Sequence, residues 1–126
     1  MLIKTFTLNT KQKSLLIDFY TQNNTLTTHI LSFEYLRISS PDSIGKKTKS
    51  GQPQIISHKK EVILSNIESV AKHGYRFIYD DGHSAIYSEE YIQLLAKEYE
   101  VRWQHYLADI KANGYSREAM IDFKQL

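Results

Sequence analysis

The chain has 126 residues, with 16 basic and 14 acidic side chains, a formal net charge of +2 and no cysteine. Its length and its 41% content of hydrophobic residues suit one globular domain with its own core. The lack of cysteine excludes disulfide scaffolds, thiolate zinc sites, cysteine-ligated iron–sulfur clusters and cysteine nucleophiles in this chain.

The apolar runs predict a cytoplasmic protein with no membrane association. Polar residues follow Met1-Leu2-Ile3 at once, so we expect no signal peptide. The longest apolar runs are triplets such as Leu15-Leu16-Ile17, whereas a membrane-spanning helix needs about 20 apolar residues.

Residues 2–31 predict three short strands in a meander. Apolar residues alternate in the first segment, a polar turn follows at 9–13, and Asn23-Asn24 marks a second turn because Asn tolerates the left-handed conformation. Ser32 is a suitable N-cap for a short helix over 33–37, and Pro41 ends it.

Residues 41–60 predict a mobile loop. This stretch holds both prolines, and its part from 46 to 60 holds five lysines and no acid. With a net charge of only +2 and no aromatic residue between the lysines, we expect a solvated loop rather than a nucleic-acid interface.

The second half of the chain predicts a hairpin and then a helix. Residues 62–70 and 75–79 are expected to pair, with 85–87 as a short return strand after the Asp81-Gly82 turn. Residues 88–113 predict one amphipathic helix with Ser88 as N-cap and Gly114 after its end. The residues that form its apolar stripe are Ile92, Leu95, Ala96, Tyr99, Trp103, Tyr106, Leu107 and Ile110.

These elements predict the α+β class: a small antiparallel sheet, composed of a meander plus a hairpin, covered by one long C-terminal amphipathic helix. We expect a single domain over 1–126, with a short tail over 115–126. An edge strand of the sheet could support a homodimer.

The residues show no motif for catalysis or for metal binding. None of the five histidines has a second histidine four residues away or a carboxylate two residues later, and no Ser lies in a Gly-x-Ser-x-Gly elbow. Asp80-Asp81 and Glu89-Glu90 are adjacent pairs whose side chains point different ways. We therefore expect no catalytic residue, no metal ligand and no cofactor.

Two stretches together carry a family resemblance. They are the run from Phe33 to Pro41, which contains Leu36-Arg37 and Ser40-Pro41, and the run from Asn66 to Ser88, which contains Asp80-Asp81-Gly82-His83 and Tyr87. With the helix that follows, the chain resembles the DUF971 family, also called the gamma-butyrobetaine hydroxylase-like N-terminal domain. The resemblance covers about residues 1–116 and implies a small domain of the standalone bacterial type.

The resemblance also bears on metals and on activity. Related domains of carnitine-pathway oxygenases bind structural zinc through three Cys and one His, and His83 matches that His. The Cys positions fall on Ser40, Asp42 and Gly45, so the ligand set is incomplete and we expect no tightly bound zinc. The catalytic iron of those oxygenases belongs to a separate downstream domain, so their activity is not expected here.

The family motif nominates one candidate surface, formed by Arg37, Asp81, Gly82, His83 and Tyr87. A purely structural role is also open: Gly82 with positive φ in the turn, Arg37 paired with a turn carboxylate, and Tyr87 packed under the sheet.

Two functions follow as expectations. The first is a non-enzymatic adaptor whose partner is a protein, such as an iron–sulfur carrier P-loop ATPase, because family members occur fused to such ATPases. The alternative is a small-ligand or metal-binding regulatory domain that uses the turn Asp81-Gly82-His83, in which His83 acts with Asp81 or with Asp42. Nothing in the sequence supports an enzyme.

Overall fold

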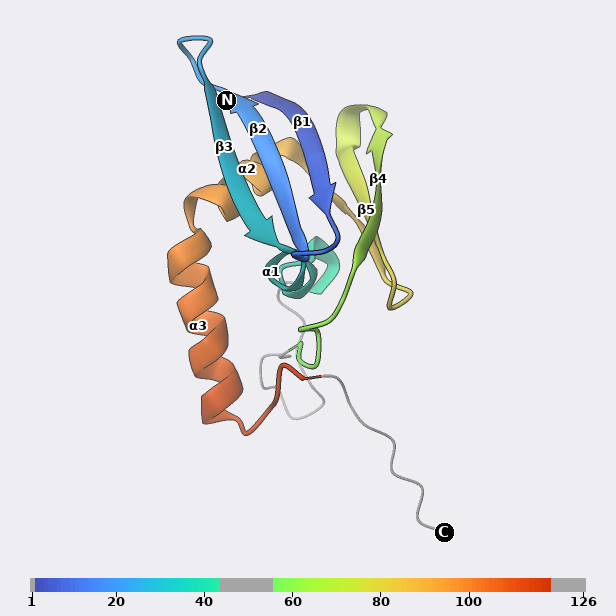
Figure 1. Cartoon of the computed structure of the whole chain (residues 1–126), viewed down its shortest axis with the longest axis vertical. Helices are drawn as coiled ribbons and strands as arrows, with labels where there is room; N and C mark the ends of the chain where they lie inside the picture. Colours follow the sequence, from blue (N-terminus) through green and yellow to red (C-terminus); the bar gives the residue numbers. More distant parts are fainter. Residues whose placement is uncertain (1, 44–55, 119–126) are drawn as a thin grey trace.

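A computed structural model describes residues 2–43 and 56–118. These residues form two three-stranded antiparallel sheets, three α-helices and two short 3-10 helices (Figure 1). In chain order the elements are β1 Leu2–Asn9, β2 Ser14–Tyr20, β3 Leu26–Ser32, α1 Phe33–Ile38, η1 Pro41–Ser43, β4 Leu64–Val70, η2 Ala71–His73, β5 Gly74–Tyr79, β6 Ser84–Tyr87, α2 Glu89–Lys97 and α3 Tyr99–Ala112. The predicted α+β class is confirmed.

The predicted meander is confirmed as the first sheet, in the order β1-β2-β3. Its two turns place Lys13 and Asn24 at positive φ, as expected for Asn24. Alternate residues of β2 face inward, and Leu15, Ile17 and Phe19 are fully buried there. The opposite face of this sheet points away from the core.

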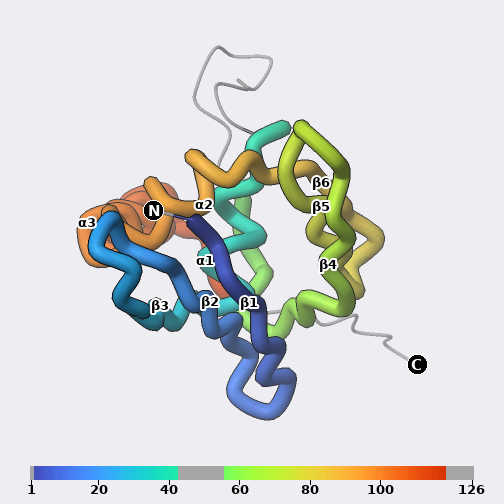
Figure 2. The backbone as a smooth tube through the Cα atoms, turned by 90° about the horizontal axis from the view of Figure 1, so that it is seen from above, coloured from blue at the N-terminus to red at the C-terminus, as the bar shows by residue number. Residues whose placement is uncertain are grey.

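The predicted short helix is confirmed as α1, which lies between the two sheets in Figure 2. The hydroxyl of Ser32 caps it by accepting a hydrogen bond from the Tyr35 amide at 3.0 Å. The first five of its six residues are all buried, so this helix has almost no solvent-facing side. Its charged side chains therefore need partners inside the protein.

The second half of the chain forms a sheet of its own, β4-β5-β6, and does not extend the meander. The expectation of one sheet is therefore wrong, because aromatic rings separate β1 from β5. The ring of Phe6 meets the rings of Tyr75 and Phe77 edge-on, with centroid distances of 4.9 and 6.0 Å respectively. Side chains rather than backbone hydrogen bonds join β1 to this sheet.

The predicted long helix over 88–113 is broken at Glu98, whose φ of −101° and ψ of 17° end α2 before α3 begins. Tyr35 explains the break, because its hydroxyl donates a 2.7 Å hydrogen bond to the carbonyl of Leu95. In a continuous helix that carbonyl would accept from the amide of Tyr99. The predicted caps hold: Ser88 accepts from the Tyr91 amide at 3.1 Å, and Gly114 has a φ of +69°.

The apolar stripe survives the break, since all of its residues are buried or half-buried. Among residues 2–43 and 56–118, no helix is both long and apolar enough to cross a membrane.

The predicted mobile loop over 41–60 falls largely on residues 44–55, which lie outside the described residues. Its described ends are ordered. Residues 41–43 form η1, and residues 58–60 pair with the tail. There, the His58 amide donates to the Ser116 carbonyl at 2.8 Å and the Lys60 amide to the Arg117 carbonyl at 2.9 Å.

The second sheet contains one backbone position that no side chain fits. Gly74 has a φ of +119°, and a Cβ there would lie 2.2 Å from the carbonyl oxygen of Tyr87. We predict that Gly74→Ala lowers the free energy of unfolding by about 3 kcal/mol, because strain and overlap both act. Urea unfolding measures this. Gly114→Ala is the matched control, since its φ is also positive but no atom lies within 4 Å of its Cβ, and it should cost about 1 kcal/mol. Equal losses would contradict the prediction.

Candidate functional site

The β5–β6 turn meets the end of α1 through one carboxylate. Asp81 accepts a hydrogen bond from Arg37 Nε at 2.9 Å and one from Lys59 Nζ at 2.7 Å, both on Oδ2. Its other oxygen accepts from the amide of His83 at 3.1 Å. Gly82 has a φ of +86°, which lets the turn close so tightly. The structure thus brings together Arg37, Asp81, Gly82 and His83, as the sequence predicts.

Two cations hold the carboxylate of Asp81 in its charged form. Burial alone would raise the pKa of Asp81, but hydrogen bonds from Lys59, Arg37 and the His83 amide outweigh it and lower that pKa to about 2. Asp81 is therefore fully ionised near neutral pH and bound to two cations. With so low a pKa it is a poor acceptor for a proton from a substrate.

His83 lies at the centre of a second hydrogen-bonded group, with Ser40 and Asp42. Its Nε2 is 2.8 Å from Ser40 Oγ and 3.3 Å from Asp42 Oδ1, and the Ser40 hydroxyl also contacts Asp42. Burial, and then the nearby Arg37 charge, lower the pKa of His83. The imidazole is therefore mostly neutral at pH 7.

Zinc does not fit this group. Ser40 and Asp42 are two of the positions where related domains have Cys, and the third, Gly45, lies outside the described residues. An imidazole, one carboxylate and an alcohol that hydrogen-bonds both of them do not form a tetrahedral ligand set. Within residues 2–43 and 56–118, no group of three or more His, Asp or Glu side chains could hold a metal ion.

The same three residue types also fail as a Ser-His-Asp triad. A triad needs the nucleophile at one imidazole nitrogen and the carboxylate at the other. Here Ser40 and Asp42 both approach Nε2 of His83. The hydroxyl of Ser40 is also inaccessible to a substrate, since the residue is completely buried. These hydrogen bonds hold η1 and the residue before it against the β5–β6 turn.

Tyr87 does not belong to a surface, which corrects the predicted motif surface. It is completely buried and its ring stacks on Phe77, with centroids 4.3 Å apart. Its hydroxyl bonds the Tyr79 hydroxyl at 2.7 Å and donates to the Leu36 carbonyl. Arg37 is also buried, so only Asp81, Gly82 and His83 of the predicted set reach solvent. Side chains alternate between the two faces of β6, and the face that carries Tyr87 meets α1 rather than solvent.

Two partners in this cluster were missed by sequence reasoning. The ring of Tyr79 lies 5.9 Å from the Arg37 guanidinium and 6.1 Å from the His83 ring. Tyr79 ends the strand predicted over 75–79, two residues before Asp81, and this position could have predicted the contact. Lys59 gives no such signal, because it is one of several lysines in a loop and lies 22 residues from Asp81.

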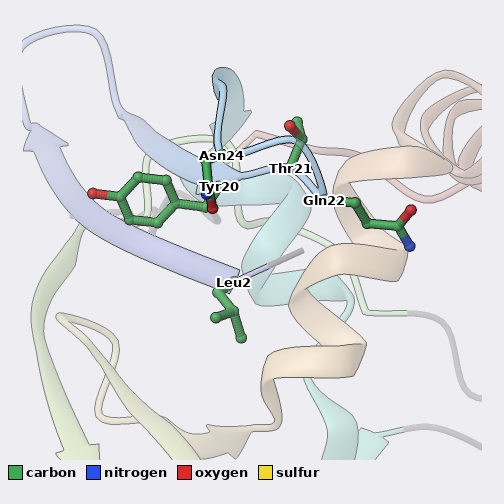
Figure 3. A pocket seen from close by; sticks show the side chains of 5 residues that line it. All are labelled: Leu2, Tyr20, Thr21, Gln22 and Asn24. Atoms are coloured by element: carbon green, nitrogen blue, oxygen red, sulfur yellow. The ribbon is translucent and has the colours of Figure 1, made fainter.

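A separate feature is the outer face of the first sheet, where apolar side chains lie in register. Leu2 pairs with Tyr20 and Tyr20 with Leu26, so the three form one row across the strands. Leu2 and Tyr20 also line a 260 Å³ pocket beside the β2–β3 turn, together with Thr21, Gln22 and Asn24 (Figure 3). Sequence reasoning assigned no role to this face.

The architecture defines a class of small α+β domain in which two antiparallel sheets enclose a buried helix. Residues 6–93 match the model of the family described as Gamma-butyrobetaine hydroxylase-like, N-terminal, and the chain belongs to this family. The matched residues end within α2, so α3 and the tail lie beyond them. No curated protein matches the chain.

Solved structures show the same fold. Two NMR solution structures each have a TM-score of 0.75 and cover 99% of this chain; their identities are 25% and 30%, and 96% and 91% of their own chains are covered. A crystal structure of a DUF971-family protein of unknown function from Acidithiobacillus ferrooxidans ATCC 23270 has a TM-score of 0.58 at 21% identity. It covers 75% of this chain, with 91% of its own chain covered, and shows the fold alone.

The charge of Asp81 should make stability depend on pH. Its pKa in the folded protein is lowered from 3.8 to about 2, so its contribution is present above pH 4 and is lost as the pH falls toward 2. We predict that Asp81→Asn lowers the free energy of unfolding by about 2–3 kcal/mol at pH 7, since it leaves Arg37 buried and unpaired. Urea unfolding from pH 7 to 2 should show this deficit shrinking below pH 4. Asp109→Asn, on the exposed side of α3, is the control and should show no such trend.

Proposed function

We propose that this chain is a small non-enzymatic interaction domain that serves iron–sulfur cluster assembly or delivery beside a P-loop ATPase of the iron–sulfur carrier type. The family resemblance supports this partner, because related domains occur fused to such ATPases. The site geometry supports a non-catalytic role. Asp81 is bonded to Arg37, and His83 to Ser40, and Ser40, Arg37 and Tyr87 are buried.

The outer face of the first sheet is the observation that carries the proposal. Leu2 is 64% exposed and Ile30 is 61% exposed, and Leu26 and Tyr20 are exposed on the same face. A cluster of exposed large apolar side chains marks an interaction surface. Asp18 lies on the same face, between Tyr20 and Leu16, and accepts hydrogen bonds from Thr28 at 2.5 Å and Thr5 at 2.8 Å, which lower its pKa. The chain's own Lys4 lies 5.7 Å from the Tyr20 ring and also lowers that pKa, so the face offers a partner mainly apolar contacts.

Substitution of this face tests the proposal. We predict that the tagged wild-type domain captures an iron–sulfur carrier ATPase from a lysate of the source cells. Ile30→Glu should reduce that capture at least about tenfold, since it places a charge in an apolar contact. Val101→Glu is the matched control, because Val101 is equally exposed at 61% but lies on α3. Quantitative mass spectrometry of the captured proteins provides the measurement. Absence of any such ATPase, or equal loss in both variants, would refute the proposal.

The alternative function, a small-ligand or metal-binding regulatory domain at Asp81-Gly82-His83, has one observation in its favour. Arg37 Nη1 is buried beside this turn without a hydrogen-bond partner. Against it, both oxygens of Asp81 are already bonded, and the described residues hold no metal-binding group.

Metal addition and removal separate the two functions. We predict that purified protein contains no stoichiometric zinc by elemental analysis, and that neither EDTA nor added Zn²⁺ or Mn²⁺ changes its Tm. The incomplete ligand set is the reason. A bound metal would raise the Tm according to its concentration relative to Kd. His83→Ala, tested in parallel, should abolish any such rise if the alternative is correct.

A further inference from the structure

A second buried charge of α1 is bound by the far end of the chain. Glu34 is only 4% exposed, and its carboxylate receives a fork of hydrogen bonds from Arg117. Arg117 Nε donates to Oε2 at 2.9 Å and Nη2 donates to Oε1 at 2.8 Å. This two-bond geometry matches a guanidinium and cannot be reproduced by the single ammonium of lysine.

Two aromatic side chains of α3 complete the surroundings of the guanidinium. The hydroxyl of Tyr106 donates to Glu34 Oε2 at 2.7 Å and fixes the carboxylate in place. The ring of Trp103 lies 5.2 Å from the Arg117 guanidinium carbon, within the range of a cation–π contact. Glu34, Trp103 and Tyr106, here called the Glu34 pocket, thus supply a carboxylate, an aromatic face and a positioning hydroxyl.

The arginine in this pocket comes from a segment outside the regular elements. Residues 115–118 follow α3 and belong to no helix or strand. Backbone hydrogen bonds to Ile110, His58 and Lys60, a hydrogen bond between His58 Nδ1 and the Glu118 carbonyl, and the exposed ion pair between Lys60 and Glu118 hold them. An irregular surface segment opens locally at a lower free-energy cost than the helices and strands of the core.

The pocket is also accessible once the tail leaves. The side chain of Arg117 is 34% exposed, whereas that of Glu34 is 5% exposed. Both residues line a hollow of 240 Å³ next to Lys13 and Glu61. An arginine that approaches from solvent can therefore reach the carboxylate along the path that Arg117 now fills. Departure of Arg117 without a replacement would leave the Glu34 carboxylate with the hydroxyl of Tyr106 and no cation, which favours a new cation.

We propose that the Glu34 pocket is a binding site for an arginine side chain, occupied by Arg117 of the chain's own tail and open to an arginine of a partner protein when the tail is displaced. The identity of that partner rests on the proposed interaction function, but the pocket itself does not. Arginine binding to the pocket is measured on the purified chain, so its outcome does not depend on the lysate capture.

The test uses the full chain with Arg117→Ala and N-acetyl-L-argininamide as the probe. Trp103 is the only tryptophan, so its fluorescence reports directly on the pocket. We expect a saturable fluorescence change with a Kd on the order of 1–10 mM, typical of so small a ligand. At about ten times Kd the probe should also raise the Tm by several degrees. Wild-type protein should show neither effect, because Arg117 fills the pocket.

The controls assign the effect to the pocket. N-acetyl-L-citrullinamide lacks the charge, and N-acetyl-L-lysinamide lacks the fork, so both should bind at least about tenfold more weakly. The double variant Glu34→Gln/Arg117→Ala should not bind the probe. Arg76→Ala is the matched control, since it removes an arginine whose partner Glu68 is exposed, and it should create no binding.

Each other outcome overturns the proposal: no saturable change in Arg117→Ala, equal binding of the citrulline probe, or the same response in wild-type protein. If Arg117→Ala does not fold, the titration is repeated on Arg117→Gln, whose amide still donates to Glu34. If neither variant folds, recovery of the far-ultraviolet circular dichroism signal with added probe replaces fluorescence. Saturable recovery supports the pocket, and no recovery refutes it.

Discussion

The burial of α1 between two sheets is the constraint on which the rest of the structure depends. A helix with almost no solvent-facing side must place every polar group inside the protein, and α1 carries both Glu34 and Arg37. Each of these charges is paired with a residue far along the chain, Glu34 with Arg117 and Arg37 with Asp81. The two ion pairs therefore join α1 to the tail and to the β5–β6 turn, because a lone buried charge would be too costly.

Tyrosine hydroxyls provide hydrogen bonds to carbonyl groups near the ends of helices, where these carbonyls have no partner within the helix. Tyr87 donates to the carbonyl of Leu36, and Tyr91 donates to that of Ser39 at 2.6 Å. Tyr35 does the same for Leu95 at the end of α2. Three of the nine tyrosines thus share one structural role, since each of these hydroxyls satisfies a carbonyl near a helix end while its ring packs in or against the core.

The parts of the fold that depend on local patterns were predictable from the sequence. The meander, the cap at Ser32 and the turn glycine at Gly82 follow from neighbouring residues, and all three are present. The break at Glu98 was not predictable, because it depends on a hydroxyl from Tyr35, 60 residues earlier than the carbonyl it binds. No proline or glycine marks that position.

The candidate site also has one part that the sequence predicted and one part that it did not. A family motif brought Arg37, Asp81 and His83 together correctly, whereas the burial of Tyr87 required knowledge of which face of β6 meets α1. The ion pair between Arg117 and Glu34 could not be predicted from the sequence, because a charged residue indicates a partner only once it is known to be buried.

The late position of the covering elements has a consequence for synthesis of the chain on the ribosome. The first sheet is complete by Ser32, yet α2, which supplies Ile92 and Leu95 to the shared core, follows more than 50 residues later. Until then Leu15, Ile17 and Phe19 lack the part of their cover that α2 provides. A strand face that is only partly covered during synthesis is prone to association with other chains, so chaperone binding to the nascent protein should matter more for its yield than for its final stability.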